Sequence, residues 1–281
     1  MLGHLEQSIS MYLEYTGTLL KDLKNVPTPF VDQDSLTDQD WVEQGELDGE
    51  ALALLMKVLY CARLARPDLL RPVNELGRHI TKWSRACDKQ LHRLFHYIHS
   101  SKHHVLVSSM GDDINDLQIE LFTDADLASE KADTKSTNGF FCVMSGPTSN
   151  GVCAYGHKRQ TCTALCTPEA EIVSLNHGLK NCGLPMKDLW EFILQRPVRL
   201  LVHEDNETCI TIVKKGYSPQ LRYLDRTQRT KISWLHEVIH ELREADMEHC
   251  DTAFMRADIF TKRIKPCSWK DALDLIFIRT K

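Results

Sequence analysis

Apolar side chains recur every three or four residues in the first hundred positions of the chain, which is the spacing of amphipathic helices. The clearest stripe begins at Ala51. The pair Arg66-Pro67 interrupts it, because proline cannot donate the backbone hydrogen bond of a helix interior. Ser84 can cap a further helix that runs to Ile98. The pattern predicts a helix-like start followed by a three-helix unit. The apolar positions are Leu5, Ile9, Tyr12 and Leu13; Leu52, Leu55 and Leu59; Leu70, Val73, Leu76 and Ile80; and Leu91, Leu94 and Ile98.

After Lys102 the pattern changes to the alternation that is typical of β-strands. The turn residues Gly146-Pro147 and Asn150-Gly151 lie between two apolar stretches and predict an antiparallel pair. The triplet Thr167-Pro168-Glu169 predicts a helix start with threonine as the N-cap, and Gly183-Leu184-Pro185 is predicted to break this helix. The order of elements predicts a mixed α/β sheet flanked by helices. The predicted strands are 104–109, 117–126, 138–146, 151–158, 198–205 and one near Met247, and the later helices are 167–179, 189–193, 207–213, 232–242 and one near Ala257.

Charge is unevenly spread along the chain. Residues 31–50 carry eight acidic residues, no basic residue and few apolar ones, so they are predicted to be a mobile linker. Without these acids the formal net charge of −5 becomes +3. The richest basic run, residues 214–231, provides the local positive charge that phosphate binding requires. Arg226, Arg229 and Lys231 are therefore candidate nucleic-acid contacts, and a solvated charged loop is the alternative.

The cysteine pattern and the hydropathy of the chain indicate in which cellular compartment the protein is expected. The ten cysteines include no CxxC pair, and the sequence shows neither a secretory signal nor a run of eighteen apolar residues. We therefore expect reduced thiols, an intracellular protein and no membrane partner.

Four carboxylates stand at the ends of predicted elements. Such an acid is costly at the end of a buried strand unless it is paired or holds a cation. Clustered acids favour Mg²⁺ or Mn²⁺, and two such ions about 4 Å apart can activate water and stabilise the leaving oxygen of a phosphodiester. Each acid alone is also explained as a solvated end or a helix cap. The four are Asp124 in IELFTDAD, Glu171 in TPEAE, Asp205 in VRLLVHED and Asp258 in RADIFTK.

These segments, together with STNGFFCVMSG, resemble the RNase H domain that ends the Pol polyprotein of copia-type retrotransposons. The resemblance implies that Asp124, Glu171, Asp205 and Asp258 are catalytic metal ligands. It implies two Mg²⁺ ions, with Mn²⁺ as an alternative, and Asp124 as the residue that bridges them. The implied activity is endonucleolytic hydrolysis of the RNA strand of an RNA–DNA hybrid, which would be recognised by its backbone shape and 2′-hydroxyls.

The resemblance also divides the chain. Residues 1–50 would be an N-terminal helix and acidic linker, residues 51–112 the helical connection segment of a reverse transcriptase, and residues 113–281 an RNase H-like domain with a five-stranded mixed sheet. A polymerase domain would precede them in a larger polyprotein, which would act in the cytoplasm or the nucleus. The side chains expected to contact the bound strand are Ser136, Thr137, Asn138 and Gln160, and His249 is a candidate for assisting product release.

Two other functions fit parts of the sequence. Leu127 replaces an aromatic residue usual in the family, and Arg229 and Lys231 replace a His-x-Asp pair, so a degenerate or domesticated binding module is the first alternative. The second is a zinc peptidase that would use the HExxH pattern His236-Glu237-Val238-Ile239-His240. That reading needs a third ligand, which the following sequence does not supply.

Overall fold

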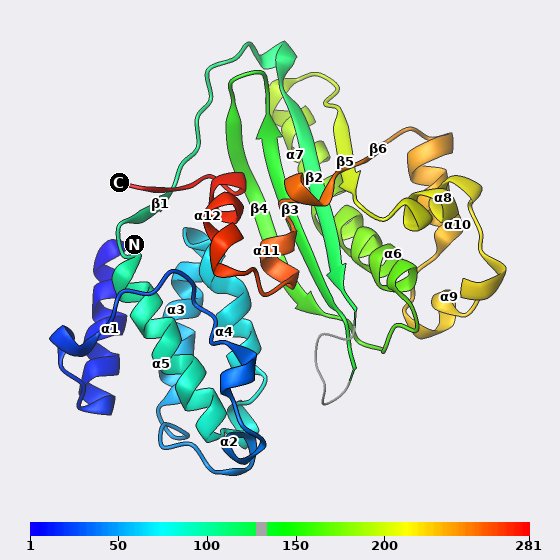
Figure 1. Cartoon of the computed structure of the whole chain (residues 1–281). Coiled ribbons are helices and arrows are strands. Elements are labelled where there is room, and N and C mark those ends of the chain that lie inside the picture. Colours follow the sequence, from blue (N-terminus) through cyan, green and yellow to red (C-terminus); the bar gives the residue numbers. More distant parts are fainter. Residues whose placement is uncertain (128–133) are drawn as a thin grey trace. The chain divides into compact units, whose positions relative to one another are not determined.

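The computed structural model describes residues 1–127 and 134–281, and these form two compact units (Figure 1). The helical unit comprises residues 1–107 and 263–281, and the sheet unit comprises residues 108–262. These limits differ from the predicted limits at residues 50 and 112. The C-terminal residues group with the helical unit because Trp269 is buried there and donates a hydrogen bond to Tyr97.

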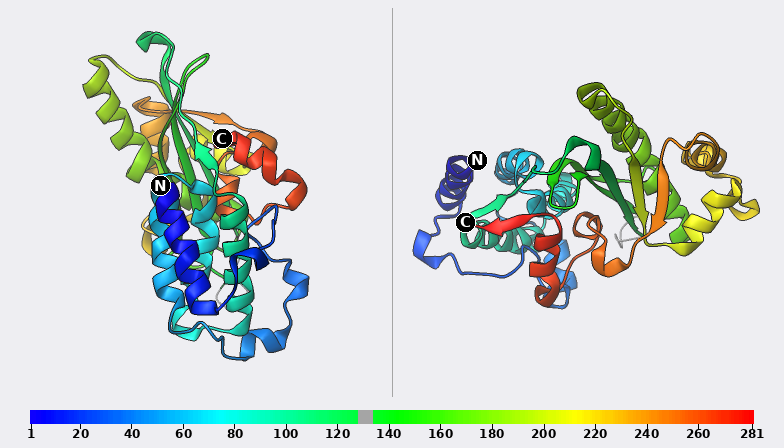
Figure 2. Two further views of the ribbon diagram at one scale, coloured as in Figure 1. Left: turned by 90° about the vertical axis from the view of Figure 1, so that its left-hand side faces the viewer. Right: turned by 90° about the horizontal axis from the view of Figure 1, so that it is seen from above.

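The helical unit buries most of the apolar positions that the sequence predicts, but in the stripe that begins at Ala51 the predicted Leu52 is 49% exposed and Leu59 is only partly buried. Leu54, Leu55 and Val58 face the interior, and Leu91 and Leu94 pack there with them. Figure 2 shows the helices of this unit side by side with their long axes roughly aligned. The segment that follows the helix ending at Ser100 forms a short antiparallel strand pair with the C-terminal residues of the chain. The elements are α1 (Leu2–Thr16), α2 (Asp38–Val42), α3 (Ala51–Leu64), α4 (Leu70–Gly77), α5 (Arg85–Ser100), β1 (His104–Leu106), α12 (Pro266–Leu275) and β7 (Ile278–Thr280).

The prediction of a mobile linker over residues 31–50 is wrong. Thr37 and Asp40 form a capping box at the start of α2, and Asp40 is 3% exposed. Lys89 on α5 pairs with Asp40 at 2.7 Å, and the carboxylate of Asp88 accepts hydrogen bonds from two backbone N–H groups of the segment. Acids of the segment therefore find basic partners on α5, and its backbone N–H groups find an acid there, which composition alone did not reveal.

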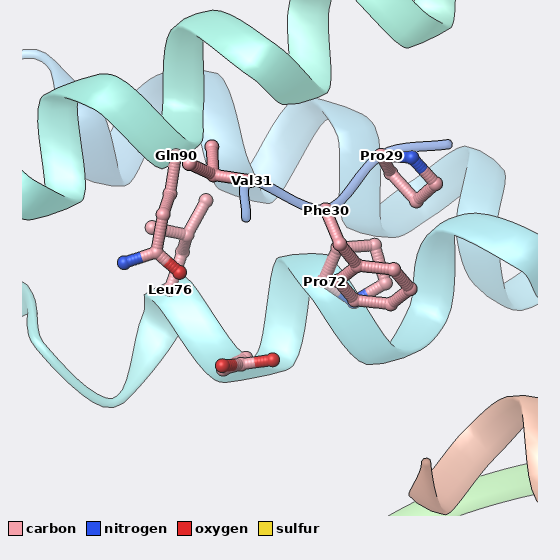
Figure 3. A pocket seen from close by; sticks show the side chains of 7 residues that line it. Pro29, Phe30, Val31, Pro72, Leu76 and Gln90 are labelled. Carbon is pink, nitrogen blue, oxygen red and sulfur yellow. The ribbon is translucent and has the colours of Figure 1, made fainter. Parts of the chain in front are cut away.

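The segment that leads into residues 31–50 is also packed. Figure 3 shows Phe30 and Val31 between α4 and α5, with Pro72 and Leu76 on one side and Gln90 on the other. The pocket that they line measures about 10 Å³, which is room for about one water molecule.

The sheet unit is built on a mixed five-stranded sheet, as predicted. Its strand order is β4-β3-β2-β5-β6, with β2, β3 and β4 antiparallel and β5 and β6 parallel to β2. The strands are β2 (Gln118–Asp126), β3 (Thr137–Ser145), β4 (Asn150–Arg159), β5 (Leu200–Glu204) and β6 (Asp246–His249), and the helices are α6 (Thr167–Gly178), α7 (Leu184–Leu194), α8 (Glu207–Lys215), α9 (Leu224–Thr227), α10 (Ile232–His236) and α11 (Asp258–Thr261).

Strand alternation places α6 and α11 on opposite faces of this sheet. Directly opposed residues of an antiparallel pair share a face, so Asp124 lies on the same face as its partner Gly139. A Cβ added at Gly139 would meet Thr261 of α11, whereas one added at Gly178 of α6 would meet Thr123. Asp124 therefore faces α11, and Thr123 faces α6.

Three local predictions require correction. The N-cap of α6 is Cys166, and Thr167 is the first helical residue. Gly183-Leu184-Pro185 does not break the helix, because a π-helical turn (Leu179–Gly183) continues directly into α7 and the proline lies in its first turn. The final helix predicted near Ala257 has only four residues, and the longer α12 was missed.

Candidate metal centre

Asp124 is a deeply buried acid at the end of a central strand. It lies near the end of β2 and is 1% exposed. The hydroxyl of Thr261 donates to its carboxylate, and Ser174 on α6 donates to its backbone oxygen at 2.7 Å. Both faces of the sheet thus hold this end of β2 in place.

Asp124, Asp205 and Asp258 form the first acidic group, which we call the Lys262 group. One carboxylate oxygen from each lies within 4.8 Å of the others. The ammonium of Lys262 lies 2.7 Å from Asp258 Oδ1, 3.1 Å from Asp124 Oδ1 and 4.0 Å from Asp205 Oδ2. The Lys262 ammonium is therefore a cation that already lies among these three carboxylates.

Glu171, Glu204 and Asp205 form the second acidic group, which we call the Glu204 group. One carboxylate oxygen from each again lies within 4.8 Å of the others. Glu171 is 3% exposed and its Oε2 has no hydrogen-bond partner, and Glu204 is fully buried. Asp205, directly after β5, belongs to both groups.

Burial and mutual repulsion disturb the ionisation of these acids. Burial, together with the charges of Glu204 and Asp124, raises the pKa of Glu171 to about 11. Burial and the charge of Asp124 raise the pKa of Asp258 to about 7. Burial also raises the pKa of Glu204 well above its ordinary value. Closely spaced carboxylates with such shifts are a ligand set that suits a hard divalent cation.

The structure brings the four predicted site acids together, from four separate elements. It differs from the expected arrangement in one respect, since Asp205 and not Asp124 is the acid that belongs to both groups. Sequence reasoning missed Glu204 and Lys262. A signal for Glu204 was present, because it is an acid inside a strand that was predicted to be buried on both faces.

The predicted contacts to a nucleic-acid strand divide into two sets. Arg226, Arg229 and Lys231 are exposed, as a phosphate-binding role requires. The other set is buried and its members are used internally, which corrects the expectation that they contact a bound strand. Gln160, for example, donates to Asn138 Oδ1 at 2.6 Å and to the backbone oxygen of Ala170 at 2.9 Å. The exposed fractions are 0% for Ser136, 2% for Thr137 and 4% for Asn138 and Gln160.

The remaining candidates lie outside the two acidic groups. His249 is an exposed residue at the end of β6. The rings of His236 and His240 are 5.2 Å apart, but no third histidine, cysteine or acid joins them in a metal-binding arrangement within the part of the chain that the structure describes. The zinc-peptidase alternative therefore lacks its third ligand there. All ten cysteines are free thiols.

Comparison with known proteins links the chain to a retrotransposon protein. No family model matches the chain. Over 192 residues, or 68% of its length, it is 23% identical to the "Retrovirus-related Pol polyprotein from transposon TNT 1-94" of Nicotiana tabacum. The chain is similar to part of a retrotransposon Pol polyprotein. The match covers 13% of that polyprotein, and it supports a Pol-related origin for the chain. Among the described residues, none of the helices is both long and apolar enough to cross a membrane.

Proposed function

We propose that the sheet unit is an RNase H-like nuclease that hydrolyses the RNA strand of RNA–DNA hybrids and uses two Mg²⁺ ions, with Mn²⁺ as an alternative. The observation that carries the proposal is the convergence of Asp124, Glu171, Asp205 and Asp258 from β2, α6, the end of β5 and α11. The mixed five-stranded sheet and the similarity to a retrotransposon Pol polyprotein support it. The helical unit would then correspond to the segment that follows a reverse transcriptase polymerase domain.

The residues present fit such ions. Asp124 and Asp258 would hold one ion, Glu171 and Glu204 the other, and Asp205 would contribute to both. Bound ions would supply activation of water and stabilisation of the leaving oxygen. The exposed bases near α9 would bind backbone phosphates beside the site. Their segment is anchored to the start of α6, because Tyr223 Oη donates to Glu169 Oε2 at 2.8 Å.

A catalytically degenerate binding module is the second candidate. It is favoured by Lys262, whose ammonium lies where an ion would have to bind, and by the burial of the residues predicted to contact the strand. This reading predicts that the protein binds hybrids without cutting them.

Cleavage of a labelled RNA–DNA hybrid separates the two candidates. We expect wild-type protein to cut the RNA strand only with Mg²⁺ or Mn²⁺, and Asp124→Asn to be folded but inactive. Asp116→Asn, which changes an exposed acid before β2, is the matched control and should retain activity. Hybrid binding without cleavage by wild type would favour the binding module, and equal cleavage by Asp124→Asn would refute the assignment of the site.

A further inference from the structure

The protein neutralises its two acidic groups to very different degrees. The Lys262 group contains a resident ammonium at 2.7 Å and 3.1 Å from two of its carboxylates. For the Glu204 group, no ion pair of Glu171 or Glu204 with a lysine, arginine or histidine forms among residues 1–127 and 134–281. Within the Glu204 group, only Asp205 approaches a cation: its Oδ2 lies 4.0 Å from the ammonium of Lys262.

The contacts of Glu204 do not compensate for its burial. Its Oε2 accepts from the hydroxyl of Thr123 at 3.3 Å, and its Oε1 accepts from the backbone N–H of Asn206 at 3.2 Å. Both donors are neutral. Beside it, Glu171 Oε2 is buried without any partner. Two adjacent carboxyls in such surroundings need either protons or a cation.

Lys262 has the opposite character. It lies directly after α11 on extended backbone, and its side chain is 37% exposed. A flexible side chain at this position can leave the carboxylates for solvent without a change in the fold. Its ammonium and a divalent ion cannot share the group, because each would occupy the space between Asp124 and Asp258.

We propose that Glu204 is a ligand of the first divalent ion to bind, which enters the Glu204 group, and that Lys262 competes with the second ion for the Lys262 group. This inference rests on the two-ion site of the proposed function but requires no activity toward RNA. Glu204 adds a third carboxylate to the first site, and Lys262 makes the second site weak until the ammonium is displaced.

The test is a titration of the full chain with Mn²⁺, in which the electron paramagnetic resonance signal of the free ion reports how much Mn²⁺ is bound. Wild type should bind one ion tightly and a second weakly. Glu204→Gln should weaken the tight step by at least about tenfold, because losing even a group that only orients a metal ligand costs about that much affinity. Lys262→Met should strengthen the weak step by about tenfold, because a repelling charge is removed, and should change the tight step much less, since only Asp205 of that group lies near the ammonium. Glu207→Gln and Lys214→Met, at exposed positions on α8, are charge-matched controls that should change neither step.

Thermal unfolding in a chelator checks the fold of each variant and gives a second readout. Without metal, Glu204→Gln should unfold at a higher temperature than wild type, and Lys262→Met at a lower one. If Glu204→Gln fails to fold, Glu204→Asp retains the charge but shortens the reach, so it should still weaken the tight step; if Lys262→Met fails to fold, Lys262→Gln removes the same charge and should still strengthen the weak step.

An unchanged tight step in Glu204→Gln, or an unchanged or weaker second step in Lys262→Met, would overturn the proposal. Wild type that binds no Mn²⁺ would overturn both this proposal and the nuclease. The expected titrations without hybrid cleavage would leave the ion sites standing and refute only the proposed activity.

Discussion

Glu171 is a single residue whose charge the folded protein accommodates poorly when no ion is bound. Its folded-state pKa, raised to about 11 by burial and by Glu204, lies far above its ordinary value of 4.5. Between these two pH values the folded state keeps a proton that the unfolded state has lost. The stability of the metal-free protein must therefore fall as pH rises through this window.

Glu171→Gln should remove this dependence. In a chelator, we expect the unfolding free energy of wild type to fall relative to the variant between pH 5 and pH 8, with a slope of up to about 1.4 kcal/mol per pH unit. The histidines are the same in both proteins, so their titration cancels. Urea unfolding at several pH values measures the difference. Parallel pH curves for the two proteins would contradict the raised pKa of Glu171, and saturating Mg²⁺ should reverse the advantage of the variant.

The sequence could identify four acids of the candidate site because acids at the ends of apolar elements stand out from their neighbours. It could not show that Lys262 approaches Asp124, which depends on how the short helix α11 packs against the sheet. It also could not show that Gln160 donates a hydrogen bond to Asn138, since their pairing is set by the contact of β3 with the segment after β4.

Among the elements, α6 determines where Glu171 lies, and its approach to the sheet depends on Gly178. A Cβ at Gly178 would lie 2.6 Å from Thr123 Cγ2 on β2. Gly178→Ala should therefore destabilise the protein by about 1–3 kcal/mol through overpacking, despite the better helix propensity of alanine. It should also weaken binding of divalent ions, because α6 must move away from the strand.

A second substitution makes this expectation specific. Adding Thr123→Ser removes Cγ2 and keeps the hydroxyl that donates to Glu204, so the double variant should recover both stability and ion binding. Gly77→Ala on α4 is the matched control. Its Cβ would meet nothing within 4 Å, and it should be neutral or stabilising. Equal losses in Gly178→Ala and the double variant, by chemical denaturation, would rule out the clash as the cause.

The basic segment at α9 is an element whose role can be tested apart from the chemistry. Arg226→Ser and Arg229→Ser should weaken binding of RNA–DNA hybrids and reduce the salt dependence of log K by about one per lost phosphate contact. Both side chains are exposed, so the fold should not change. Fluorescence anisotropy at several salt concentrations gives the slope, and binding that falls without a change of slope would argue against phosphate contacts.

Most elements were predictable because their apolar period is strong, as in α3, α5 and the central strands. The structure of the acidic segment, residues 31–50, was not predictable in this way. Its helix α2 is stabilised by pairing with Lys89 and Arg85, which lie far along the chain, so its own composition predicted a linker. The break expected at Pro185 failed because a π-helical turn leads directly into α7, with the proline at the second position of α7.

At the scale of the whole molecule, the chain leaves the helical unit at residue 107 and returns to it at residue 263. No local pattern could predict this return, because the contacts that create it join residues far apart in sequence. Trp269 donates to Tyr97 Oη at 3.2 Å, and Tyr97 donates in turn to the buried carboxylate of Asp68 at 2.8 Å. Asp68 also pairs with the buried Arg66 at 2.7 Å.

Trp269→Ala tests whether the two units have separate stabilities. Trp269 is 3% exposed, so its truncation should cost the helical unit about 3–5 kcal/mol. If each unit unfolds as its own cooperative block, calorimetry of wild type should show two transitions, of which only that of the sheet unit rises with Mg²⁺. Trp269→Ala should lower the transition of the helical unit and leave the Mg²⁺-dependent transition in place.

Trp269→Phe, which keeps most of the packing but loses the N–H donor, should lower the transition of the helical unit by less. A single transition that Trp269→Ala and Mg²⁺ both shift would mean that the helical unit and the metal centre fold as one block, and that damage at Trp269 reaches the acids through the common unfolding equilibrium.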